Sequence, residues 1–475
     1  MENQEEGPRR RESGLWRRAR TRRVLICSAA GCAVLGGALW ALPWGRPAEP
    51  AGPSPGALAM AAVGAGVPAD AAGLAELIDE REKHVRARPR DATSWAVLGT
   101  AYVERGRRLG DPAFYPRAER ALRTSLSVRP QRNVPALTGL AALSNARRDF
   151  PAARRWAEQA RRLEPRRWTT YPLLIDAFTG LGEYAAAKRM LDRLGELRSG
   201  PAVLARAAGV YRDRGWREDA AASLADAAAG AREPAERAAY VERAGQLAWE
   251  RGDLQAALRH FREALRLDAD LPSAQIGQGR TLAALGRTTE ALNAYRAALA
   301  RQPLPGHALE LGELYESLGM PEAARVQYDL LRERVRAAGA AGADEELVLG
   351  RYEADHGDPE DAVRRLRAEF ARQPGSEVAD ALGWALHRAG RSGEGLRYAV
   401  RATDGERGGG VRSAAFMYHR GMIERELKRY GAARRHLAEA LRVNPHFSPL
   451  HAPRARAAAR ALGDPPDVRP PELDE

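Results

Sequence analysis

The sequence is poor in cysteine and in aromatic residues. Its 475 residues include only two cysteines, Cys27 and Cys32, and both lie in one apolar run near the N-terminus. The rest of the chain therefore has no thiolate with which to form a disulfide or a cysteine-ligated metal site. Aromatic residues make up 6% of the chain, while alanine, leucine and arginine dominate. This mixture favours helix over strand, because such side chains lose little rotamer freedom in a helix.

Lysine is also scarce, although the net charge is +13. Only three of the 75 basic residues are lysines, Lys83, Lys188 and Lys428, so that 72 are arginines. The arginines are interleaved with aspartate and glutamate along every segment and form no single basic stretch. Charge alone therefore does not favour a nucleic-acid partner. The abundance of Arg, Ala, Gly and Pro is typical of a GC-rich genome, and we expect a bacterial protein.

Catalytic motifs are missing as well. The segment GQGRTLAALG (277–286) superficially resembles a phosphate-binding loop, but it lacks the closing Gly-Lys-Ser/Thr and no strand precedes it. The nine histidines are scattered, and His446 and His451 beside prolines form only a weak candidate for a metal pair. We predict no enzyme, no cofactor, no metal site and no small-molecule substrate.

One long uncharged run is present, VLICSAAGCAVLGGALWALPW at residues 24–44. A helix of these 21 residues would rise about 30 Å, which matches the hydrocarbon core of a bilayer. Eight arginines precede the run, so the positive-inside rule places residues 1–23 in the cytoplasm and the remainder across the membrane. We predict a single-pass anchor in the lipid bilayer, with the rest of the chain extracytoplasmic.

Two alternatives to a retained anchor remain open. A cleaved signal is one, and TRRVLI (21–26) is similar to a twin-arginine export signal. Lipidation of Cys32 is the other, since SAAGC is similar to a bacterial lipobox. In the first case the protein would be secreted, and in the second it would be an exported lipoprotein.

The remainder of the chain repeats one pattern. A small residue opens the second half of each copy, and successive ones lie 33 to 38 residues apart. They are Ala118, Ala153, Ala187, Ala220, Ala257, Ala291, Ala324, Ala362, Gly395 and Ala433. Five residues before most of them stands a glycine that is suited to a turn: Gly182, Gly215, Gly252, Gly286, Gly319, Gly357 and Gly390. Such a period over more than 300 residues indicates a stack of structural repeats.

Each copy contains signals for two helices. Apolar residues three to four apart mark the first helix, as in LELGELY (309–315), and the second, as in RGDLQAALRHFREALRLD (251–268). WAVLGTAY (95–102) and LELGELY resemble the W-x2-L-G-x2-Y pattern of the tetratricopeptide repeat family, and Ala291, Tyr295 and Ala298 resemble its second half. The resemblance implies an all-α, right-handed superhelical solenoid of about ten helix-turn-helix repeats, preceded by one transmembrane helix.

The predicted organisation follows from these patterns. It consists of a basic cytoplasmic segment (1–23), the transmembrane or signal segment (24–44), a flexible Pro/Gly/Ala linker (45–72), an N-terminal capping helix (73–90), the repeat array (91–446), a C-terminal capping helix (447–463) and a disordered tail (464–475). No ordered stretch is left over for an enzyme domain.

The family resemblance also implies a concave face that binds peptides or proteins. Matching the family's positions one by one gives Asp176, Arg212, Gln246, Trp249, Arg280, Glu313, Arg351, Trp384, His387, Met422 and Arg425. Trp249 and Trp384 are the predicted anchors, since aromatic side chains concentrate binding energy. We therefore expect a non-catalytic scaffold or assembly factor that binds protein partners. The alternatives are an accessory subunit of an envelope enzyme or export complex and, less favoured, a nucleic-acid-binding solenoid.

Overall fold

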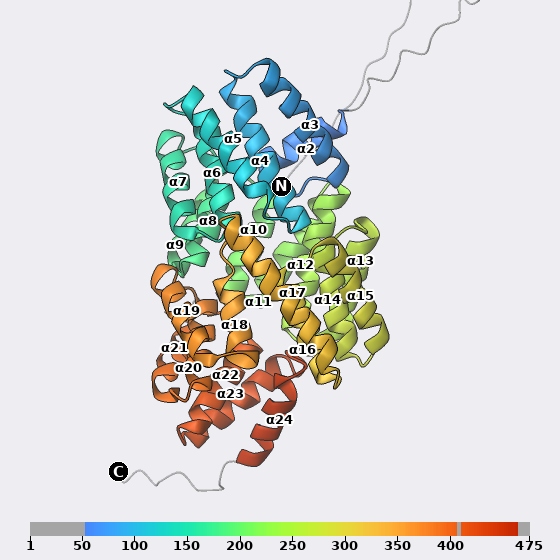
Figure 1. Ribbon diagram of the computed structural model, residues 1–475, viewed down its shortest axis with the longest axis vertical. Coiled ribbons are helices and arrows are strands. Elements are labelled where there is room, and N and C mark those ends of the chain that lie inside the picture. The colour runs from blue at the N-terminus through green and yellow to red at the C-terminus, as the bar shows by residue number, and fades with distance from the viewer. Residues whose placement is uncertain (1–52, 406–409, 464–475) are drawn as a thin grey trace, which may run out of the picture. The chain divides into compact units, whose positions relative to one another are not determined.

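The computed structural model describes residues 53–405 and 410–463, and over these ranges every regular element is a helix (Figure 1). The predicted anchor at 24–44 and the tail at 464–475 lie outside the described residues. No helix within the described ranges has the length and apolar character that crossing a membrane requires. The described residues from Ser54 onward belong to one compact unit.

From α4 to α23, the described residues form ten helix pairs that follow one another, and consecutive pairs lie against each other. The first helices of the pairs are α4 (Ala92–Leu109), α6 (Val134–Ala146), α8 (Thr170–Gly180), α10 (Pro201–Asp213), α12 (Pro234–Glu250), α14 (Pro272–Ala284), α16 (Pro305–Ser317), α18 (Glu346–His356), α20 (Ser376–Arg388) and α22 (Ala414–Glu426). The second helices are α5 (Phe114–Val128), α7 (Phe150–Leu163), α9 (Tyr184–Leu197), α11 (Arg217–Gly230), α13 (Leu254–Leu267), α15 (Thr288–Arg301), α17 (Pro321–Ala340), α19 (Pro359–Arg372), α21 (Ser392–Thr403) and α23 (Tyr430–Val443). The prediction of an all-helical repeat solenoid is confirmed.

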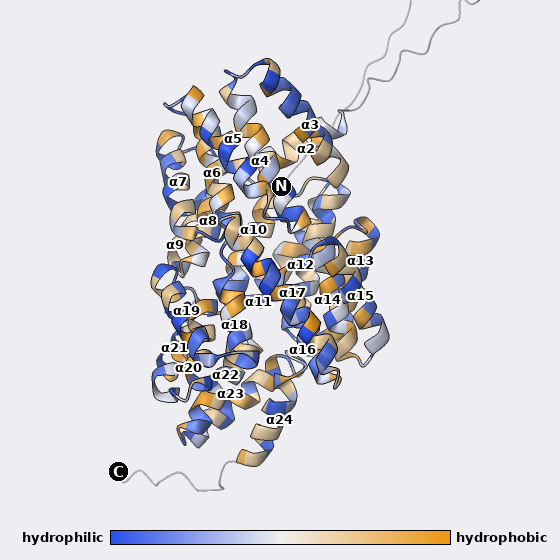
Figure 2. Cartoon of the chain, viewed as in Figure 1, coloured by the Kyte–Doolittle hydropathy of each residue, from blue (hydrophilic) through white to orange (hydrophobic). Residues whose placement is uncertain are grey.

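Small residues let the two helices of a pair approach closely. The small residues that recur through the copies are buried, as Ala257 and Ala291 illustrate at 0% exposure. On the first helix, a Cβ added to Gly312 would stand 2.3 Å from the ring of Tyr328. In Figure 2 hydrophilic and hydrophobic residues alternate along most helices, as expected of helices that bury one face and expose the other.

The turn inside each pair needs a residue with positive φ in most copies. Six of the predicted turn glycines have φ between 71° and 78°: Gly182, Gly215, Gly252, Gly286, Gly319 and Gly390. Gly357 also lies in the predicted turn, between α18 and α19, but its φ is −127°. In the second and tenth copies, Arg148 and Lys428 take the turn position, each with a φ of 59°.

The N-terminal end of the array differs from the prediction. The segment interpreted as a flexible linker contains helix α2 (Pro55–Ala65), which packs on α3 (Ala71–Ala87), the helix expected as a lone cap. The Ser54 hydroxyl caps α2 by accepting from the Ala57 N–H at 3.2 Å, and Gly66 ends it in a left-handed conformation. Because small residues occupy all sides of α2, no apolar stripe marked it in the sequence. At the other end, α24 (His451–Leu462) lies within the predicted C-terminal cap.

Distant copies also touch each other. The turns and helix ends of the first five copies contact segments that lie 192 to 197 residues further along the chain. The hydrogen-bonded pairs are Gln302 with the Arg107 carbonyl, the Asp344 N–H with the Arg147 carbonyl, Tyr184 with Ser376, Arg217 with the Arg412 carbonyl and Asn444 with the Trp249 carbonyl. We call this series of contacts the seam. In Figure 1, α19 lies beside α9, near the point where Tyr184 at the start of α9 meets Ser376 at the start of α20.

Candidate functional site

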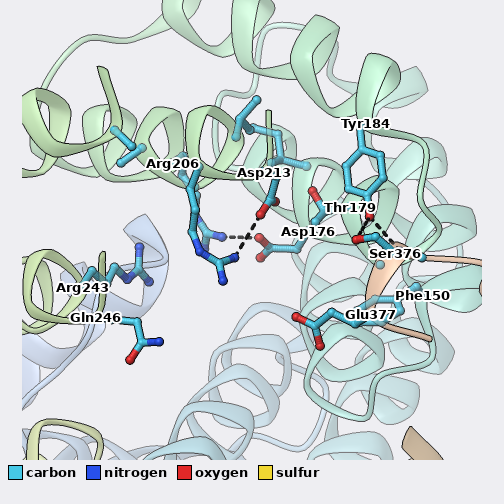
Figure 3. A pocket seen from close by; sticks show the side chains of 18 of the residues that line it. Phe150, Asp176, Thr179, Tyr184, Arg206, Asp213, Arg243, Gln246, Ser376 and Glu377 are labelled. Carbon is cyan, nitrogen blue, oxygen red and sulfur yellow. Dashed lines mark hydrogen bonds and ion pairs between the residues drawn. The ribbon is translucent and has the colours of Figure 1, made fainter. Parts of the chain in front are cut away.

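Residues of the seam and of the first helices of three copies line an open cavity of about 520 Å³, which we call the central cavity. Side chains from α8, α10 and α12 line one side of it, and residues 373–378 line the other. Figure 3 shows Tyr184 meeting Ser376 at its edge; their hydroxyl oxygens lie 2.7 Å apart. The predicted concave-face residues Asp176, Arg212 and Gln246 all line this cavity.

A ladder of ion pairs and hydrogen bonds joins successive first helices. Arg212 donates to both carboxylate oxygens of Glu250, at 2.8 and 2.7 Å. Gln246 donates to Glu250 at 3.1 Å and accepts from Arg280 at 2.9 Å. Arg280 in turn binds Glu310 in a bidentate pair, at 3.0 and 2.7 Å. The ladder therefore neutralises two charges of the predicted face, Arg212 and Arg280, and it connects four copies of the array.

Two charged residues of α12 have no place in this ladder. Within the described residues, neither Glu242 nor Arg243 has an ion-pair or hydrogen-bond partner, and both line the central cavity. Desolvation by the surrounding cavity walls, together with the nearby Arg206 cation, lowers the pKa of Arg243, although its side chain is in contact with solvent; desolvation also raises the pKa of Glu242. Figure 3 shows that Arg206 is itself paired with Asp176. Arg243 is thus a cation that a negatively charged group could approach.

One carboxyl group beside these residues titrates near neutrality. Burial raises the pKa of Asp213 to about 6, even though Arg212 donates to it at 3.1 Å. The charge of the central cavity therefore changes between about pH 5 and 7.

The two predicted tryptophan anchors are buried. Trp249 is 6% exposed and Trp384 is 5% exposed. The Trp249 side chain packs in a core cluster with Phe261 and Ala274, and its backbone carbonyl accepts from Asn444 at 2.8 Å. The Trp384 indole donates to Asp355 at 3.0 Å and stacks on His419. Neither side chain offers the exposed aromatic surface that an anchor for a partner needs, and this expectation is corrected.

The predicted face residues that do not line the central cavity lie on separate surfaces. Trp249, Arg280 and Glu313 line a second cavity of about 490 Å³, and Arg351 pairs with Glu377 at 3.5 Å. A groove at the C-terminal end of the array is lined in part by His387, Met422 and Arg425. The eleven predicted residues are therefore distributed over several surfaces, and the structure does not gather them into one continuous groove.

Neither of the weak sequence motifs forms a site. Gly277 and Gly279 of the apparent phosphate loop are buried within α14, where added Cβ atoms would stand 2.2 Å from Phe261 and 2.8 Å from Tyr295. Over residues 53–405 and 410–463, no cluster of three or more His, Cys, Asp or Glu side chains is arranged to hold a metal ion.

Sequence reasoning missed Arg243 and the positions Arg148 and Lys428. Arg243 stands three residues before the expected face position Gln246, so only the three-dimensional arrangement places it in the cavity. Arg148 and Lys428 did carry a signal, because each replaces the glycine that other copies use at a left-handed turn. Arg148 lines the central cavity and Lys428 lines the C-terminal groove.

Comparisons with known proteins agree with the helical repeats. Residues 276–341 and 347–411 match one description of the tetratricopeptide repeat, and residues 414–447 match a second. The matched segments are thus similar to tetratricopeptide repeats. No curated protein matches the sequence at a significant level.

Solved structures with similar folds include a human IFIT1 dimer with PPP-AAAA, at 18% identity and a TM-score of 0.45 over 68% of this chain and 76% of that chain. A tetratricopeptide repeat protein from Parabacteroides merdae is 18% identical, with a TM-score of 0.33 over 56% of this chain and 99% of that one. Yeast Tom70 is 13% identical, with a TM-score of 0.34 over 77% of this chain and 95% of that one.

Proposed function

We propose that this protein is a non-catalytic scaffold that binds an extended segment of a partner protein in the central cavity. The observation that carries the proposal is that Glu242 and Arg243, which have no hydrogen-bond or ion-pair partner among the described residues, line a cavity that also has apolar walls. Apolar contacts would supply binding energy, and the two charges would select an oppositely charged group and its orientation. Tetratricopeptide repeats over 276–447 make a protein or peptide the expected class of ligand.

The size of the cavity favours a segment over a folded domain. A volume of about 520 Å³ is within the range of sites that hold small ligands or a few side chains. Arg243 is exposed to solvent at this cavity, and an extended segment reaches it without displacing the side chains around it.

A protein partner is favoured over a nucleic acid because key arginines are already ion-paired. Arg212 and Arg280 are already held by glutamates in bidentate pairs, so they are not free to neutralise a row of phosphates. A nucleic-acid-binding solenoid stays the less favoured alternative, and an accessory subunit of an envelope enzyme or export complex stays the main one.

We place the repeats outside the cytoplasm, tethered through residues 24–44. The support is the uncharged run of 21 residues and the eight arginines before it. A lipoprotein modified at Cys32 or a secreted form would place the repeats on the same side of the membrane. Protease treatment of intact cells after wall removal tests this orientation, and protected repeats would contradict it.

The binding proposal is tested by charge reversal at the cavity. The full chain carrying Arg243→Glu should lose its partner in affinity capture from native membranes, because the partner's acidic group would face a like charge. Arg259→Glu, at an exposed position on α13, is the matched control and should retain the partner. Capture that survives Arg243→Glu would contradict the proposal, and capture that depends on nuclease-sensitive material would support the nucleic-acid alternative.

A further inference from the structure

The tenth copy places a cation at its turn at a conformational cost. Lys428 adopts φ 59°, the left-handed region that a residue with a side chain rarely occupies, where most other copies use glycine. Its side chain lines the C-terminal groove, a depression of about 650 Å³. A strained residue that puts a charge at the edge of a groove suggests a role in binding.

The C-terminal groove is positively charged and its cations are not neutralised. Arg425, Lys428 and Arg434 line it, against the single acid Glu426. Within the described residues, neither Arg425 nor Lys428 has an ion-pair partner, and both are exposed. Tyr430, which is 50% exposed, adds an apolar surface. The groove therefore suits a chain that carries carboxylates and a few apolar side chains.

The chain itself leaves α24 at this groove. Ala461 and Leu462 line it, and Arg434 fixes the exit by donating to the Leu462 carbonyl at 2.9 Å and the Gly463 carbonyl at 2.7 Å. The residues that follow, DPPDVRPPELDE (464–475), contain five acids and one arginine. Their two proline pairs favour an extended backbone, which fits a groove better than a helix would.

We propose that residues 464–475 bind in the C-terminal groove of the same chain, with their carboxylates facing Arg425 and Lys428. The start of this segment is covalently attached at the rim, so its effective concentration is high and weak contacts suffice. The segment would cover His387, Met422 and Arg425, three residues of the predicted concave face. It would then compete with a partner that reaches this end of the face. The competition rests on the proposed function, whereas the intramolecular binding does not.

The binding is tested by crosslinking in the full-length chain. A photoreactive residue at Tyr430 should crosslink to residues 464–475 of the same chain, identified by mass spectrometry, whereas one at the exposed Trp216 should not. The double variant Arg425→Glu/Lys428→Glu should reduce the Tyr430 crosslink at least fivefold. Adding Asp464→Lys/Asp467→Lys should restore it, which separates charge pairing from misfolding. The yield should also fall as salt is raised, because exposed charges are screened.

Several results would overturn the proposal. One is a Tyr430 crosslink to residues other than 464–475. Another is a crosslink yield that stays the same in the Arg425→Glu/Lys428→Glu variant. A third is a crosslink between isotopically distinct copies, which would assign the groove to a second chain. Competition is measured separately: a chain that ends at Gly463 should bind the captured partner roughly threefold more tightly or better. If the truncated and full-length chains bind the partner with equal affinity while the crosslink is intact, only the competition is overturned. Loss of capture with Arg243→Glu reports only on the central cavity.

Discussion

At the scale of single residues, several histidines are held by carboxylates. His356 is an example, since its side chain is only 8% exposed and lies 3.1 Å from Glu316 and 3.6 Å from Glu313. Burial disfavours the charged ring, but the two glutamates outweigh this effect and raise the pKa of His356 above its usual 6.5. The ring also stacks on Tyr328, so its charge state is coupled to the core between α16 and α18.

This arrangement predicts a stability that depends on pH. Because the pKa of His356 is raised in the folded state, its contribution to the stability of the fold is complete below pH 6.5. This contribution is lost as the pH rises through the folded-state pKa. When the pH is raised from 6 to 8, the thermal unfolding temperature of wild type should therefore fall by more than that of His356→Gln. A difference between the two proteins that stays constant with pH would show that the glutamates do not set this pKa.

At the scale of the helix pair, glycine on the first helix decides how closely the second can approach. Gly312 in α16 faces Tyr328, which is 8% exposed and is held by Tyr352 and His356. By contrast, Gly209 in α10 has no atom within 4 Å of an added Cβ. Both are glycines within a helix, so their substitution separates packing from helix propensity.

Replacing these two glycines should shift stability in opposite directions. Gly312→Ala should destabilise the fold by about 1–3 kcal/mol, because the ring of Tyr328 must move out of a packed core. Gly209→Ala should stabilise it by about 0.5–1 kcal/mol, because alanine has less backbone freedom to lose. The midpoints of urea unfolding measure both, and a Gly312→Ala protein as stable as wild type would mean that the pair can separate without cost.

The helix pairs are also the part of the fold that sequence could predict. The regular recurrence of small residues such as Ala257 and Ala291 follows directly from helix crossings, which is why ten copies could be counted. Helix α2 was missed because its alanines and glycines give no apolar stripe, and its contacts with α3 alone reveal its buried side. The hydrogen bond from Asn444 to the Trp249 carbonyl could not be foreseen, since the two residues lie 195 positions apart.

At the scale of the whole array, the seam changes how the repeats depend on one another. In a linear stack each copy contacts only its neighbours, so that stability is a sum of local terms and the ends can unfold independently. Here the first five copies bind the last five, and each contact closes a loop of nearly 200 residues. Whether distant copies meet depends on small rotations between successive helix pairs that add up over five copies. No local pattern in the sequence reports these rotations.

The seam predicts cooperative unfolding of the array. The triple variant Tyr184→Phe, Gln302→Ala and Asn444→Ala removes three seam hydrogen-bonding groups, each worth about 1 kcal/mol. We expect wild type to unfold in one transition and the variant in two, with amides of α22 and α23 exchanging hydrogen earlier than those of α8. The control variant Thr124→Ala, Ser127→Ala and Ser317→Ala removes three hydrogen bonds within single helices and should keep one transition. Identical exchange patterns in the two variants would mean that the seam adds contacts without coupling the copies that it joins.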